Sequence, residues 1–138
     1  MNPIPSVSAI LICDRVIEEA GTGKKTLVGI FERAHAPQVP ALVPFAIYAR
    51  LTDAEGDYRF RINISFLRSD REEVIGQLSA EIRNVQARLG VLEVGLNLPP
   101  WPFPSFGRYE VQLYANDIYI AHTAIDVIQI GGQQERNA

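Results

Sequence analysis

Residues 107–129, GRYEVQLYANDIYIAHTAIDVIQ, decide the fold class of this chain. Apolar and polar side chains alternate from Tyr109 to Ala115, which is the period of a strand with one buried face. Asn116 and Asp117 then interrupt the run, and both residue types tolerate the left-handed backbone of a two-residue hairpin turn. The stretch therefore predicts an antiparallel hairpin, with a bulge near His122 where the apolar phase of the second strand changes.

The entry to this hairpin, Gly107-Arg108-Tyr109, resembles the start of a late strand in many immunoglobulin-like sandwiches. A glycine permits the corner there, and the tyrosine is expected to place its ring in the core and its hydroxyl against a backbone group. The motif is common, so it supports the fold without indicating a function.

Period-two alternation recurs through the rest of the chain, and no long amphipathic helix interrupts it. Residues 7–16 are apolar on both faces, which predicts a central strand covered on both sides. Residues 83–89 have the apolar spacing of one helical turn but are too short to be helical alone, so a helical turn and a loop both remain open. Further strands are predicted at residues 26–35, 45–52, 58–67, 74–82 and 92–98.

Proline marks where these strands stop. The run at residues 99–104, PPWPFP, is expected to end the preceding strand because proline cannot donate a ladder hydrogen bond. The pattern gives about eight short strands and no linker that would divide the chain. We therefore predict one all-β domain over residues 1–138, an antiparallel two-sheet sandwich of the immunoglobulin-like or C2-like type, with a flexible tail at residues 131–138.

The composition limits the classes of protein to which this chain can belong. Hydrophobic residues make up 47% and charged residues 21% of the chain, which is typical of globular domains. A net charge of −3 offers no general attraction to phosphate backbones, so we expect no nucleic-acid partner. The single cysteine, Cys13, cannot form an internal disulfide, and the apolar run before Asp14 is too short to span a membrane. We expect a cytoplasmic protein with no membrane span.

Six stretches of the chain carry a family resemblance: CDRVIE at residues 13–18, GTGK at 21–24, LVGIF at 27–31, YARLTD at 48–53, LNLP at 96–99 and the hairpin at 107–117. Together they resemble a family of small bacterial proteins classed as a domain of unknown function. The resemblance covers nearly the whole chain. It implies a cytoplasmic β-sandwich and brings no assigned activity, cofactor or partner.

Two loops carry partial signatures of ligand sites. The segment GTGKKT at residues 21–26 lacks the first glycine of a phosphate-binding loop, because that position is Glu18. Asp53, Glu55 and Asp57 alternate like the start of a calcium loop, but the sixth position is Tyr58, where that loop needs glycine. A C2-like domain that binds calcium or lipid headgroups through its acidic loops remains an alternative.

Signatures of catalysis are absent from the sequence. No G-x-S-x-G elbow or comparable arrangement occurs. His35 and His122 are far apart in the chain, and with Cys13 they would form a metal set only if the fold brought them together. We expect no enzyme and no cofactor, with a hydrolase using His122 or His35 as a further alternative.

Two groups of residues are candidates for contact with a partner. Arg50, Arg59 and Arg61 are expected to share the solvent-facing side of one strand pair, beside Tyr48. Trp101, Phe103 and Phe106, interleaved with prolines, either pack against the end of the sandwich or form an exposed aromatic anchor. The leading hypothesis is a non-enzymatic interaction or self-assembly module that binds another protein or a second copy through edge strands or this aromatic loop.

Overall fold

The computed structural model describes residues 2–131, which form eleven strands and no helix. The predicted all-β class is confirmed, whereas the predicted strand count of about eight is too low. The expected tail lies outside the described residues apart from Gly131. The strands are β1 (Ser6–Glu18), β2 (Lys25–Ile30), β3 (Arg33–Ala36), β4 (Ala41–Val43), β5 (Ala46–Thr52), β6 (Ala54–Leu67), β7 (Glu72–Ala87), β8 (Leu92–Asn97), β9 (Trp101–Phe103), β10 (Gly107–Ala115) and β11 (Ile118–Gln129).

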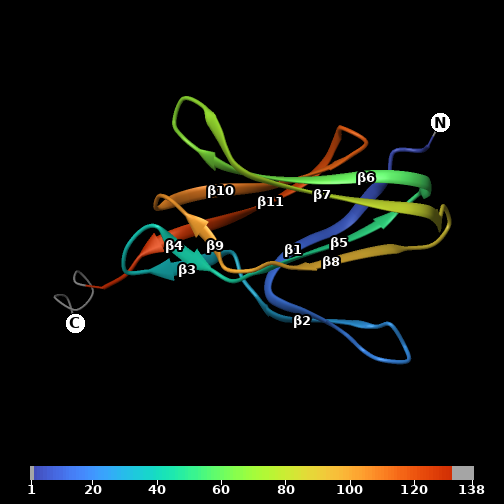
Figure 1. The fold of residues 1–138 in the computed structure, drawn as a ribbon, viewed down its shortest axis with the longest axis horizontal. Helices are drawn as coiled ribbons and strands as arrows, with labels where there is room; N and C mark the ends of the chain where they lie inside the picture. The colour runs from blue at the N-terminus through green and yellow to red at the C-terminus, as the bar shows by residue number, and fades with distance from the viewer. Residues whose placement is uncertain (1, 132–138) are drawn as a thin grey trace.

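Two main sheets face each other in two layers (Figure 1). The four-stranded sheet has the order β2-β1-β5-β8, and the five-stranded sheet has the order β3-β11-β10-β6-β7. All pairings are antiparallel except that of β3 with β11, which is parallel. A two-residue link carries the chain from β2 in one sheet to β3 in the other, so no hairpin imposes an antiparallel direction there.

The core lies between the two sheets, and the alternating residues fill it. Ile62 and Ile64 of β6, Val111 of β10 and Leu51 of β5 are buried there. The alternation follows from burial of one face of each sheet, since successive side chains of a strand point to opposite faces.

The first strand is apolar on both faces because both faces are covered. Cys13 pairs with Ile30 of β2 and with Ala46 of β5, so β1 joins both strands. Beyond Cys13, β1 and β2 bend under the outer face of the four-stranded sheet, where Val16 exchanges two hydrogen bonds with the Asn97 side chain (2.8 and 3.0 Å). A second apolar cluster results, formed by Cys13, Val16, Ala46 and Tyr48. The prediction of a doubly covered strand is confirmed near Ile12 and Cys13, whereas Ser8 and Arg15 are exposed.

Residues 83–89 form neither a helical turn nor a loop over most of their length. β7 continues to Ala87 and pairs with β6 up to Ala54. Asn84 has a φ of 57°, and the register shifts at this point. This bulge lets Ile82 and Val85 both face inward, because the extra residue resets the period-two phase. The helix-like spacing of apolar residues in this stretch is therefore caused by the bulge.

The proline-rich run also forms a strand, against expectation. β9 pairs with β4 in a separate two-stranded sheet, with Pro102 opposite Leu42. Each strand of so small a sheet has a free edge, which is where proline is tolerated. The prediction that no ladder continues through residues 99–104 is wrong for these three residues.

Candidate functional site

An apolar cleft opens between the edges of the two sheets. Its volume is about 120 Å³, and it lies between β7 of the five-stranded sheet and the β8 segment of the four-stranded sheet. Residues 88–91 connect these two strands directly, so both edges border the same side of the molecule (Figure 1). The residues that line it from these two strands include Leu78, Ala80 and Ile82 on β7, and Val94, Leu96 and Leu98 on or just after β8.

Both strands that border the cleft have an unpaired edge. β7 and β8 are the last strands of their sheets, so each has a neighbouring strand on one side only within the described chain. The backbone N–H and C=O groups along such an edge are available to another strand. A segment that paired with β7 beside the cleft could form hydrogen bonds with its free main-chain groups and could contact the apolar residues of the cleft.

The aromatic residues predicted to contact a partner are mostly packed against the protein itself. Phe103 is fully buried, with its ring centroid 5.9 Å from that of Phe45 and 4.8 Å from that of Tyr109. Phe106 is half-buried against the core. Trp101 is also half-buried, and its indole occupies the place of the missing side chain at Gly76 of β7. Trp101 therefore lies beside the β7 end of the cleft.

The three arginines do not share one face. Arg50 lies on β5 in the four-stranded sheet, whereas Arg59 and Arg61 lie on β6 in the five-stranded sheet. Asp53, with a φ of 59°, carries the chain from one sheet to the other, so β5 and β6 are not a hairpin. The expectation of a common arginine surface is wrong for this reason.

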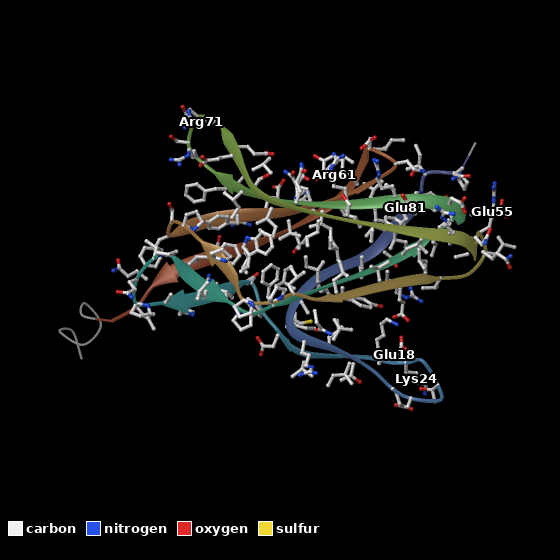
Figure 2. The ribbon with its side chains drawn as sticks, in the orientation of Figure 1. Glu18, Lys24, Glu55, Arg61, Arg71 and Glu81 are labelled. Carbon is white, nitrogen blue, oxygen red and sulfur yellow. The ribbon has the colours of Figure 1, made fainter. Side chains whose placement is uncertain are left out.

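Arg61 is held by neighbours on the outer face of the five-stranded sheet. Its guanidinium lies 4.3 Å from the centroid of the Tyr114 ring and 2.6 Å from the Asp117 carboxylate. Figure 2 shows its side chain standing outward from β6. Such a cation–π and ion-pair arrangement fixes the side chain, so Arg61 is less free to bind a partner than an exposed arginine.

The acidic residues of the calcium alternative are engaged separately. Glu55 forms an ion pair with Arg88 at 3.7 Å, and Asp57 accepts a hydrogen bond of 2.9 Å from the backbone N–H of Asn84. Within residues 2–131, no group of three or more histidine, cysteine or acidic side chains is placed to hold a metal ion. The structure therefore does not assemble Asp53, Glu55 and Asp57 into such a group.

The two histidines and the cysteine are not brought together. His35 pairs with Ile128 of β11, six residues along that strand from His122, a separation of roughly 20 Å. His122 is exposed beside Glu110, with 3.8 Å between Nε2 and Oε2. Cys13 is fully buried, and burial raises the pKa of its thiol. A buried thiol with a raised pKa is a poor nucleophile.

Comparison with known proteins places the chain by sequence. Residues 8–128 match a family of unknown function, DUF6941. The chain belongs to this family. No curated protein matches the sequence. The expected resemblance to a family of unknown function is confirmed over these residues, and membership in DUF6941 brings no activity with it.

Several solved structures have a similar arrangement of strands at very low identity. An alkylpurine DNA glycosylase from Pseudomonas fluorescens has a TM-score of 0.49 at 7% identity, over 90% of this chain and 30% of that one. A β-glucosidase from Listeria innocua has a TM-score of 0.47 at 6% identity, over 92% of this chain and 16% of that one. An immunoglobulin-like protein from Pseudomonas aeruginosa has a TM-score of 0.40 at 10% identity, over 91% and 97%. We draw no functional conclusion from likenesses this weak.

The DUF6941 chain also has a buried polar group that the sequence did not indicate. Asn63, Ser65 and Gln112 are buried on the outer face of the five-stranded sheet. Gln112 donates hydrogen bonds to Glu72 (3.0 Å) and Glu110 (2.8 Å). Alternation correctly assigns these residues to the polar face, but it does not reveal their burial, nor that Glu72 of β7 lies within hydrogen-bond distance of Gln112.

A second polar contact, on the outer face of the four-stranded sheet, predicts alkaline sensitivity. The Tyr48 hydroxyl donates a hydrogen bond to Glu93, and burial together with this acidic neighbour raises the pKa of Tyr48 to about 12. Because the folded pKa exceeds the ordinary value of 10, this stabilisation is complete below pH 10 and is lost as the pH rises toward 12. We expect the urea midpoint to fall over this window, and to fall less in Tyr48→Phe. Parallel profiles for the two proteins would contradict the assignment.

No helix within residues 2–131 is long and apolar enough to cross a membrane.

Proposed function

We propose that this DUF6941 protein is a non-enzymatic interaction module that accepts an extended protein segment along the edge of β7. The observation that carries the proposal is the open apolar cleft beside two free strand edges. Strand addition is a common mode of recognition, in which main-chain hydrogen bonds supply affinity and pockets for alternate side chains supply specificity.

The residues that face the cleft determine the pattern of side chains that the partner segment needs. Leu78, Ala80 and Ile82 alternate along β7 and face the cleft. A strand paired with β7 would turn every second side chain to the same side. The partner segment therefore carries apolar residues at every second position, with polar residues between them on the side that faces solvent.

Other features support the same type of protein. The described chain is all-β and its two sheets enclose one core, so the proposal includes a sandwich of the immunoglobulin-like type. A buried unpaired cysteine and a net charge of −3 are compatible with a cytoplasmic location and a protein partner. In this proposal the cleft supplies the place of contact.

Selection of displayed nonapeptides against the purified protein tests the proposal. We expect enriched peptides with alternating apolar residues, and an affinity loss of tenfold or more in Leu78→Glu because the carboxylate would lie in the apolar cleft. The matched control is Leu42→Glu, since Leu42 is 67% exposed on β4, away from the cleft. Peptides without alternation, or equal binding by both variants, would overturn the proposal.

A further inference from the structure

A regular stretch of β7 lies between two irregularities. Residues 76–82 pair in unbroken register with residues 58–64 of β6. The register shifts between Val74 and Gly76 at one end and between Ile82 and Val85 at the other. Bulges interrupt edge pairing, so the edge open to a new strand is confined to these seven residues.

This seven-residue stretch is complementary to itself. When two copies pair antiparallel about Ser79, all seven residues find partners. On the cleft side, Leu78 lies opposite Ala80 of the other copy, and Ile82 lies opposite Gly76. Each pair thus matches a large side chain with a small one, which is the condition for close packing across a strand pair.

The outward-facing side chains are complementary as well. In the same register, Gln77 lies opposite Glu81 of the second copy, so its amide can donate to that carboxylate, and this contact occurs twice. Glu81, labelled in Figure 2, is the only charged residue of the stretch, and its carboxylate also lies 3.3 Å from the Arg83 guanidinium just beyond it. A register centred on Ser79 keeps the two Glu81 carboxylates apart, whereas one centred on Glu81 would place them face to face, which is unfavourable.

Trp101 completes the surface at the end of the stretch. Its indole covers Gly76, where a side chain would otherwise stand, and it remains half-buried. In the Ser79-centred register, Ile82 of the second copy lies beside this indole. The two clefts would then border each other under a continuous ten-stranded sheet.

From these observations we infer that the segment accepted at β7 is the β7 strand of a second copy of this chain. The inference rests on the proposed function and names its partner. The interface is isologous, because the same seven residues serve both copies about a two-fold axis.

Cross-linking through Ser79 tests the register. In the inferred dimer the two Ser79 residues face each other, so their Cα atoms lie about 4.5–5.5 Å apart, within the range of a disulfide. Oxidation of Ser79→Cys is expected to give a covalent dimer in most of the protein. The matched control is Thr26→Cys, an exposed position on the edge strand β2, and the wild type controls for Cys13, which is buried.

Charge variants test the same pairing without a cross-link. Gln77→Glu places carboxylates opposite Glu81 twice, and we expect the dimer dissociation constant in sedimentation velocity to rise about tenfold. Gln77→Lys should lower it, and Gln77→Glu combined with Glu81→Lys should restore dimerisation. Gln77 is exposed, so these changes leave the core intact.

Failure of the inference is distinguishable from failure of the proposed function. Cross-linking of Ser79→Cys no greater than that of Thr26→Cys, with a monomer at every concentration, would overturn the second copy as partner. If alternating peptides still bind in that case, strand acceptance stands and a different protein supplies the strand. If neither peptides nor a second copy bind, both proposals fail.

Discussion

Replacing Phe103 with serine is expected to lower the free energy of unfolding by about 4 kcal/mol. Phe103 is fully buried, and its ring contacts those of Phe45 and Tyr109. Serine would leave a cavity where three aromatic rings meet and would bury a hydroxyl there. The measurement is urea denaturation followed by circular dichroism.

Leu42→Ser is the matched control for this change. Leu42 lies opposite Pro102 in the same two-stranded sheet, but it is 67% exposed, so its replacement should cost less than about 1 kcal/mol. Equal losses for the two variants would show that the β9 segment does not pack into the core as described.

This expectation limits how the aromatic segment can be tested for partner binding. A variant that replaces both Trp101 and Phe103 would lose binding through unfolding alone, because Phe103 belongs to the core. Trp101 is half-buried and lies beside β7, so only its single replacement reports on a surface contact. Trp101 therefore stays a predicted contact residue, and Phe103 is a structural one.

The terminal hairpin could be predicted almost completely from sequence because its determinants are local. Asn116 and Asp117 have φ values of 49° and 67°, as a two-residue turn with left-handed residues requires. The register shift lies between Tyr119 and Ala121, close to the bulge predicted near His122. Turn chemistry and the period of two act over neighbouring residues, so no knowledge of the rest of the chain is needed.

The assignment of strands to sheets could not be predicted in the same way. Arg50 and Arg59 lie in adjacent strands of the sequence, and a single residue, Asp53, separates their two sheets. A hairpin turn and a crossing between layers use similar residues, so the pattern does not distinguish them. Strands of three or four residues, such as β4 and β9, are also too short for a period to be recognised.

From the sequence, only the type of candidate site could be predicted, and its position could not. Edge strands were expected to accept a partner, but the cleft arises because β7 and β8, last in different sheets, border the same side of the molecule. The position of the cleft is therefore a property of the sheet topology. Leu78 and Val94 point inward and are apolar, as core residues are. Their spacing in the sequence does not show whether the space between the sheets is filled or forms a cleft.

At Tyr109, the contribution of the ring to stability can be measured separately from that of the hydroxyl. Its ring is fully buried, with the centroid 4.8 Å from that of Phe66. Its hydroxyl accepts a hydrogen bond from the Ser105 N–H (3.0 Å) and donates one to the Ser105 carbonyl (2.7 Å). This is the contact with a backbone group that the Gly107-Arg108-Tyr109 motif predicts.

Two replacements at this position should therefore give graded losses. Tyr109→Phe keeps the ring and removes both hydrogen bonds, so we expect the free energy of unfolding to fall by about 1.5–2 kcal/mol. Tyr109→Ala also removes the ring and should cost about 5 kcal/mol, because a large cavity forms beside Phe66 and Phe103. Tyr119→Phe, at a side chain that is 49% exposed, should change stability by less than about 0.5 kcal/mol. A Tyr109→Phe protein as stable as the wild type would show that solvent replaces the hydroxyl without loss, leaving the ring alone to fix the corner.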